Sequence, residues 1–295
     1  MLKHNPFLFA KLSLRKNSSL KVRPSGFTLV ELILVIIILG VVGIATTQYL
    51  SLGAQIYADA TERDEAVAQS RFMLARLTRE LRHATPNSVR LSCSAGCTSN
   101  GEQCLEFTPF KASTIYTGNI TQNSFVVVNP ADAVSLNDLL SIYALTADDV
   151  YNLSKTGKKV SQLTAKTAVT AGNPTSSWTV DNAFTVESPT KRVFVLSQPV
   201  SFCIEGSKLY RYDNYGFAAG PTYSQSTPSG NNKINGKQGI LLGQFIQNNI
   251  ATTPFFNYGS ASLTRNSVVN IRSEMGFNNT ETVSFNHEIH LPNVP

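Results

Sequence analysis

The chain has 295 residues, of which 15% are charged, and a formal net charge of +6 at pH 7. Six of its 25 basic residues precede Gly26 and no acidic residue occurs before Glu31, so 19 basic residues remain to balance the 19 acidic ones. A nucleic-acid-binding protein would carry its basic surface on the folded body, so this distribution argues against nucleic acid as a partner.

The basic N-terminal segment, residues 1–26, is followed by a long apolar segment. Every residue from 32 to 45 is apolar or Gly. Residues 27–47 would form a helix of about 31 Å at 1.5 Å per residue, enough to cross a hydrocarbon core of about 30 Å. Because flanking basic residues stay in the cytoplasm, we expect the chain after residue 47 to lie outside it.

A secretory signal peptide is the alternative interpretation of this N-terminus. Its apolar region is shorter, about 7–15 residues, and a small-residue cleavage site follows that region. Here the small residue next to the basic segment, Gly26, precedes the apolar segment instead. We therefore favour a retained single-pass anchor.

Glu31 places a carboxylate at the start of the apolar segment. A charge at the centre of a membrane helix costs about 2.5–3.5 kcal/mol on insertion scales, and such residues are usually paired and functional. Glu31 is therefore the strongest candidate functional residue of this segment. A Glu without a partner at the membrane edge is the alternative.

An amphipathic helix is predicted next. Six residues at helical spacing share one face: Val67, Ser70, Leu74, Leu77, Leu81 and Ala84. Glu80 lies four residues after Arg76, at the spacing of a helical ion pair. Pro86 disfavours helical geometry at the residue before it, which ends the helix.

We thus predict one helix over residues 27–84, with a transmembrane part at 27–47 and an amphipathic part at 48–84 that packs on a β-rich head at 85–295. Short β-type runs separated by turn residues fill the head. The predicted strands are 104–109, 124–128, 192–196, 200–205, 208–212, 255–258, 267–272 and 282–291, with a hairpin turn at 206–207. Helices are predicted at 136–145 and 238–248, and an insertion or loop at 152–177.

Four cysteines, Cys93, Cys97, Cys104 and Cys203, lie in the part of the chain that we place outside the cytoplasm. Their spacing is irregular for zinc, and disulfides form in oxidising compartments, so we predict two disulfides. Four cysteines allow three connectivities. We favour Cys93–Cys97 as a local link and Cys104–Cys203 as a link between strands, while the other pairings stay open.

His287 and His290 would be the pair of a metal site in HEIH. On the predicted strand 282–291 they point to opposite faces, so we predict no metal ligand there. The chain also shows no phosphate-binding loop, dinucleotide fingerprint or GxSxG. We predict no catalytic residue and no cofactor.

The segment SGFTLVELILVIIILGVVGIA, residues 25–45, resembles the N-terminal signal of type IV pilins and type II secretion pseudopilins. The resemblance implies cleavage between Gly26 and Phe27 by a prepilin peptidase, followed by N-methylation of Phe27. It also implies that Glu31 neutralises the N-terminal amine of a neighbouring subunit as a filament grows from its inner-membrane assembly platform.

Segments of the head, among them CLEFTPF and KRVFVLSQPVSFCIEGSKLYRY, resemble minor pilins of the MSHA pilus. The expectation is a minor type IV pilin with a cytoplasmic leader and a periplasmic head. It would then enter or initiate a pilus at the cell surface and support pilus assembly and attachment. A J-like minor pseudopilin of a type II secretion system is the alternative. A membrane-anchored periplasmic enzyme or sugar-binding module is a third interpretation.

Overall fold

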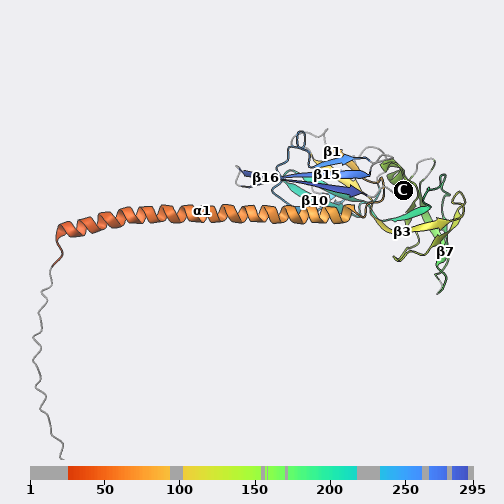
Figure 1. The fold of residues 1–295 in the computed structure, drawn as a ribbon, viewed down its shortest axis with the longest axis horizontal. Coiled ribbons are helices and arrows are strands. Elements are labelled where there is room, and N and C mark those ends of the chain that lie inside the picture. The colour runs from red at the N-terminus through yellow and green to blue at the C-terminus, as the bar shows by residue number, and fades with distance from the viewer. Residues whose placement is uncertain are drawn as a thin grey trace, which may run out of the picture. The chain divides into compact units, whose positions relative to one another are not determined.

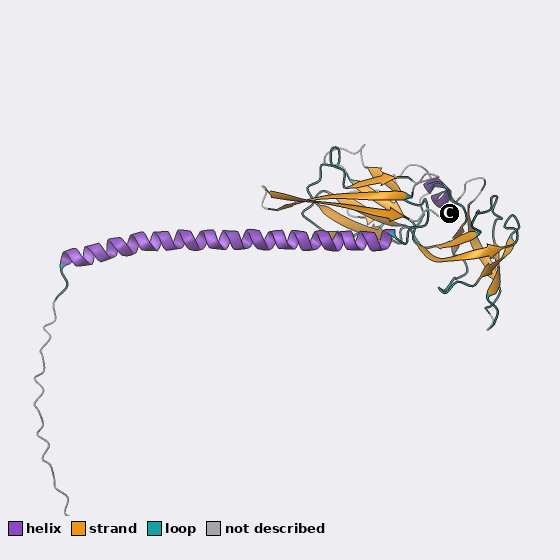
Figure 2. Cartoon of the chain, viewed as in Figure 1, coloured by secondary structure: helices purple, strands orange, loops and turns teal. Residues whose placement is uncertain are grey.

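The computed structural model describes residues 26–93, 102–153, 157, 159–169, 172–217, 233–260, 266–277 and 281–291. The chain divides into two units, of which the first ends at Ile56 and the second begins at Tyr57. The 53-residue helix α1 (Leu29–Leu81) belongs to both, and all the strands belong to the second (Figure 1, Figure 2). A long N-terminal helix followed by an antiparallel β-rich head is the α+β fold that the sequence predicts.

Local hydrogen bonds define both ends of α1. At its start the backbone N–H of Glu31 donates to Thr28 Oγ1 at 3.3 Å, so Thr28 caps the helix. At its end the N–H of Thr85 donates to the carbonyl of Thr108 at 2.8 Å, and Ala84 forms a β-bridge with Pro109. The chain therefore passes from the helix directly into β pairing.

The second half of α1 buries one narrow face. Its buried residues recur at helical spacing: Ala66, Ser70, Met73, Leu77 and Leu81. Val67 and Leu74, which the sequence placed on the same face as Leu77, are only half-buried. The predicted stripe is therefore correct in kind, but its centre lies one position earlier, at Ala66 and Met73.

Two antiparallel sheets pack with this half of α1 around one apolar core. The five-stranded sheet has the order β1 (Arg90–Cys93), β2 (Gln103–Phe107), β9 (Val200–Glu205), β10 (Lys208–Asp213) and β13 (Ile240–Gly243). The three-stranded sheet has the order β14 (Phe256–Gly259), β15 (Ser267–Phe277) and β16 (Glu281–Leu291). The shared core includes Met73, Leu77, Phe107, Phe202, Phe255 and Met275.

The central strands β2 and β9 of the five-stranded sheet are buried on both faces. Along β9, Val200, Phe202 and Ile204 join the core with α1, as the period of two requires. On the opposite face Cys203 joins Cys104, Tyr210 and Tyr212 in a second cluster. A small ribbon, β11 (Lys233–Ile234) with β12 (Lys237–Gln238), contributes Ile234 to this cluster.

A closed six-stranded barrel forms the other part of the head. Its order around the barrel is β3 (Phe110–Thr117), β4 (Ser124–Val128), β7 (Thr175–Val180), β6 (Val160–Lys166), β5 (Leu139–Ser141) and β8 (Arg192–Leu196). Closure removes free strand edges. Aromatic side chains fill its interior, including Tyr116, Phe125, Trp178 and Phe184.

The barrel is inserted into the five-stranded sheet between two neighbouring strands. The chain leaves the sheet after β2, forms the barrel and the short helix α2 (Ala147–Tyr151), and returns as β9, which pairs with β2. The two connections, at 108–109 and 197–199, meet where the N–H of Ser197 donates to the carbonyl of Pro109 at 2.7 Å.

Several sequence predictions are confirmed. Strands β4, β8 and β9 have the predicted bounds. Glu205 pairs with Lys208 across the predicted turn, where Gly206 adopts a φ of 59°. Along β16 exposure alternates between neighbouring residues, as the period-two pattern predicts.

Other predictions are wrong, each where a long-range partner overrides the local pattern. The segment 136–145, expected as a helix, contains the strand β5 instead, and β5 pairs with β6 and β8. The segment 238–248, expected as a helix, contains the strand β13 instead. A Cβ on Gly243 would overlap the Met73 side chain, so Gly is needed where this strand approaches α1. The segment 152–177, expected as an insertion or loop, does lie within the inserted barrel, but it contains β6 and the start of β7 because these strands close that barrel.

Candidate functional site

The first candidate site is the start of α1. Gly26, Phe27 and Thr28 precede the helix without regular structure, and Glu31 lies in its first turn. The Phe27 side chain is 76% exposed, and a Cβ added to Gly26 would meet no atom within 4 Å. The peptide bond between Gly26 and Phe27 is thus sterically open, while cleavage of this bond stays a prediction.

The first half of α1 exposes an apolar surface. Every residue from 26 to 56 is exposed, including Leu39 at 64%. Within the described residues, α1 is the one helix long and apolar enough to cross a membrane, with a mean hydropathy of 2.8 over its most apolar window. This surface requires lipid or apolar neighbours, since burial of such area is the main favourable term in folding and association.

Glu31 is the one charged residue in that surface. The hydroxyls of Thr46 and Thr47 bond to carbonyls of their own helix, at 2.9 Å from Val42 O and 2.9 Å from Ile44 O, as they must in lipid. Within the described part of the chain, the Glu31 carboxylate makes no hydrogen bond or ion pair. A partner for it has to come from outside this helix.

An ionic network fixes the second half of α1 to the five-stranded sheet. Glu80 accepts from Arg76, the helical pair that the sequence predicts, and from Arg211 Nε of β10 at 2.9 Å. Arg211 also donates to Asp213. Burial acts to lower the pKa of Arg211, but Asp213 and Glu80 outweigh it, and the pKa is raised. Sequence reasoning missed the Arg211 contact because its partner is 131 residues away.

A second polar cluster is buried behind the sheet. The fully buried carboxylate of Glu106 accepts from Arg90 Nε at 2.6 Å and from the Tyr215 hydroxyl at 2.8 Å. The Tyr215 hydroxyl also lies 2.7 Å from Ser201 Oγ. Burial, together with the charge of Glu106, raises the pKa of Tyr215 well above its ordinary value. Charge pairing and full burial make this cluster a structural support.

Glu102 and Glu205 lie at the end of β2 and β9. Burial raises the pKa of Glu205, a hydrogen bond from Tyr212 lowers it, and the charge of Glu102 raises it again, with a net increase. Burial also raises the pKa of Glu102. Among the described residues no three His, Cys, Asp or Glu side chains are placed to hold a metal ion.

The two histidines of HEIH have separate surroundings. His287 is half-buried, and its Nε2 lies 2.9 Å from Thr78 Oγ1 of α1, beside which β16 runs (Figure 1). His290 is exposed and pairs across the strand with Val268. The strand geometry therefore separates them, as the sequence predicts.

The structure contains a disulfide between Cys104 of β2 and Cys203 of β9. These residues face each other across the strand pair, with their Cα atoms 4.1 Å apart. Cys93 is also disulfide-bonded. Cys97 lies outside the described residues, so the favoured Cys93–Cys97 pairing stays a prediction.

Residues 22–47 match a family described as the prokaryotic N-terminal methylation motif. The match covers Gly26, Phe27, Glu31 and the most apolar part of α1, and it supports a type IV pilin-like protein that a prepilin peptidase processes and that associates with a membrane. No curated protein and no solved structure is significantly similar to the chain.

Proposed function

We propose that the chain is a minor type IV pilin of the MSHA type, similar to the biogenesis protein MshO, and a structural subunit rather than an enzyme. It enters or initiates a pilus and supports assembly and surface attachment. One observation carries the proposal. The methylation motif opens a helix that exposes every residue from 26 to 56, and Glu31 is the one carboxylate among those residues.

The physical role of Glu31 follows from its surroundings. Cleavage after Gly26 would leave a positive α-amino group on Phe27, which, like the Glu31 carboxylate, is costly in a low-dielectric environment when unpaired. Pairing the amine of one subunit with Glu31 of the next offsets both costs. The pair would also set the register of neighbouring helices, because it is the one polar contact that the apolar surface allows.

The location and partners follow from the same features. The leader remains cytoplasmic and the helix spans the inner membrane, with the head in the periplasm before assembly and on the pilus afterwards. Its partners are the prepilin peptidase, the inner-membrane assembly platform and neighbouring pilin subunits, which contact the apolar half of α1. A J-like pseudopilin would use the same helix in the same way.

Mass spectrometry of sheared surface fibres tests the assignment. We expect an N-terminal peptide that begins with methylated Phe27. The pseudopilin would be favoured if that peptide occurs only in the envelope fraction. The protein must then be abundant enough that its presence in fibres would have been detected. Finding only uncleaved chain in every fraction would overturn the pilin assignment.

Glu31→Ala tests the pairing. We expect the variant to be inserted and cleaved normally but to be lost from fibres, because the neighbour's amine then has no partner. Glu62→Ala is the matched control, since Glu62 is an exposed carboxylate on the same helix outside the apolar segment. Normal incorporation of Glu31→Ala would refute the pairing and leave the methylation result standing.

A further inference from the structure

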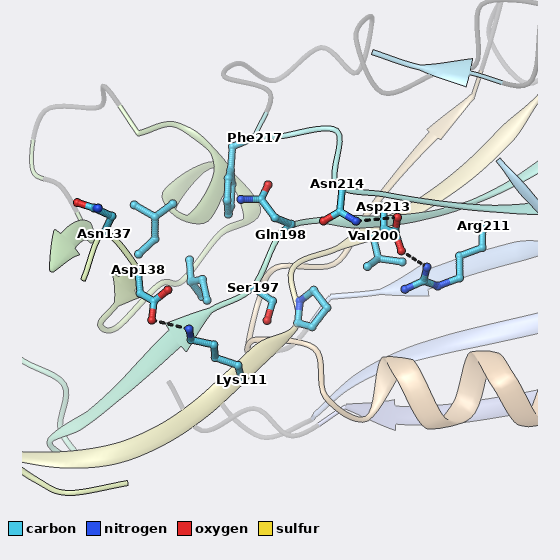
Figure 3. A pocket seen from close by; sticks show the side chains of 13 residues that line it. Lys111, Asn137, Asp138, Ser197, Gln198, Val200, Arg211, Asp213, Asn214 and Phe217 are labelled. Atoms are coloured by element: carbon cyan, nitrogen blue, oxygen red, sulfur yellow. Dashed lines mark hydrogen bonds and ion pairs between the residues drawn. The ribbon is translucent and has the colours of Figure 1, made fainter. Parts of the chain in front are cut away.

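A cleft of about 530 Å³ lies where the barrel joins the five-stranded sheet. Its lining comes from strands β3, β5, β8, β9 and β10 and from the turn after β10. The residues just before β5 and the two connections between barrel and sheet supply the rest: Asn137, Asp138, Pro109, Ser197 and Gln198. The volume falls in the range of small-molecule sites, which occur preferentially between structural bodies. Figure 3 shows one charged pair at each end of the lining, with Ser197, Gln198 and Phe217 between them.

The charges of the cleft cancel. Lys111 Nζ lies 2.5 Å from Asp138 Oδ2, and Arg211 donates to Asp213. Asp138 Oδ2 also accepts the backbone N–H of Ser135 at 2.7 Å. Since each cation already has its anion, the cleft presents fixed donors and acceptors without a net charge, which favours a neutral polar ligand.

Side-chain amides and a hydroxyl of the lining remain available, Ser197 and Gln198 between these pairs and Asn137 beside Asp138 (Figure 3). Within the described part of the chain, the side chains of Asn137, Ser197 and Gln198 make no hydrogen bond. Asn137 and Asn214 both line the cleft with left-handed backbones, at φ of 70° and 56°. Positive φ in residues other than Gly is uncommon, although Asn tolerates it.

Phe217 adds an apolar face to this polar lining. Its ring is half-buried and lies 6.2 Å from the ring of Tyr151 between centroids, which helps to hold it in place. An aromatic face beside a few convergent polar groups is a feature of small-ligand sites. It suits a ring that has hydroxyls on its edge and C–H groups on its face.

A peptide is a poorer fit for the same cleft. Peptides commonly bind by adding a strand to a free sheet edge. Each of the five strands that line the cleft is already paired on both sides, β3, β5 and β8 within the barrel and β9 and β10 within the sheet. Recognition therefore has to run through side chains.

We propose that this cleft binds a neutral saccharide unit, with Asn137, Ser197, Gln198 and Asn214 contacting its hydroxyls and Phe217 packing on its ring face. The inference goes beyond the assembly role of α1 and does not depend on it. The head of a subunit on a surface fibre would then hold a neutral glycan directly.

Binding is tested on the full chain in micelles of a detergent without a sugar headgroup. Methyl glycosides of glucose, galactose, mannose and N-acetylglucosamine are the neutral probes. Sialic acid is the anionic control and a short neutral peptide the third probe. We expect saturation-transfer NMR to show at least one neutral glycoside bound, and neither sialic acid nor the peptide.

Two cleft variants locate the site. Gln198→Ala and Asn214→Gly each remove one side chain that lines the cleft. Gly is used at position 214 because it accepts the positive φ of Asn214 without strain. Each should weaken the neutral glycoside about fivefold, as expected for one lost hydrogen bond. Lys191→Gly is the matched control, since Lys191 also has positive φ, at 54°, and does not line the cleft; it should bind as wild type does.

Three results would overturn the proposal: no neutral glycoside binds, the anionic sugar or the peptide binds instead, or both cleft variants bind as tightly as the control. Fibre incorporation of the same variants should be normal. Loss of binding with normal incorporation therefore separates this inference from the assembly role.

Discussion

The two halves of α1 share one secondary structure but differ in what surrounds their apolar side chains. In the first half Leu39 is 64% exposed, and in the second Leu77 is fully buried. The first half has no core of its own, so lipid or neighbouring helices must stabilise it. The second half contributes to the core of the head. One continuous element thus serves two purposes: the second half contributes to folding of the head, and in the proposed function the first half mediates assembly.

The largest expected effect is on the assembly half. Gly26→Glu should abolish processing, because a bulky charged side chain would replace the open Gly before the cleavage point. Intact mass spectrometry should then show only chain that retains residues 1–26. Gly53→Glu, at an equally open Gly on α1, should be processed normally; a mature-sized Gly26→Glu chain would contradict the cleavage site.

The next effect concerns the disulfide that supports the head, on which the second half of α1 packs. Replacing Cys104 and Cys203 together by Ala should lower the free energy of unfolding by about 4.7 kcal/mol in the loop-entropy model, since the residues are 99 positions apart. Chemical unfolding of the full chain in micelles measures this. A loss of less than about 1 kcal/mol would mean that the strand pairing alone holds β2 and β9 together.

Leu77→Ala against Leu39→Ala tests the comparison most directly. Truncating the buried Leu77 should cost about 2–5 kcal/mol of unfolding free energy, because it leaves a cavity in the core. Leu39→Ala should leave the unfolding of the head unchanged, since Leu39 lies outside that core. Equal effects from the two substitutions would show that the halves are not independent.

The smallest effect is a pH dependence in the sheet. The raised pKa values of Glu102 and Glu205 mean that these groups favour the folded state below their ordinary pKa of 4.5. That contribution is lost as pH rises through the raised values in the folded protein. Glu102→Gln removes one of the two charges, so it should stabilise the protein near pH 7 by less than about 1 kcal/mol, given the partial exposure of both groups.

The same substitution should have no effect near pH 4, where the carboxyls are largely protonated. Unfolding curves at both pH values measure the difference. Glu288→Gln is the control, because it removes an exposed carboxylate in the other sheet. A Glu102→Gln chain that is less stable than wild type near pH 7 would show that the carboxylate has a favourable partner.

Predictability from the sequence followed the range of the interactions. The helix of residues 29–81, the turn after Glu205 and the alternation of β16 depend on neighbours in the chain, and their patterns identify them. The leucines at 136–145 have helical spacing as well as strand content, and a short apolar run does not separate the two. Pairing of β5 with β6 and β8 decided the outcome.

The candidate sites divide in the same way. Gly26, Phe27 and Glu31 form a contiguous motif that the sequence displays in full. The cleft draws Lys111, Gln198 and Asn214 from three distant segments, and locally each is an ordinary turn or strand residue. Only the insertion of the barrel between β2 and β9 brings them together, and no spacing in the chain encodes it.

That insertion also determines how the head would respond to tension. Both connections to the barrel leave from the same end of the β2–β9 pair, where Phe107 faces Val200. A load on the barrel would therefore peel these strands apart from that end rather than shear them. Peeling would pass Phe107–Val200, Glu106–Ser201 and Leu105–Phe202 and then stop at the disulfide Cys104–Cys203. This bond therefore limits the separation of β2 from β9 to three residue pairs, which single-molecule pulling under oxidising and reducing conditions would reveal as a difference in length.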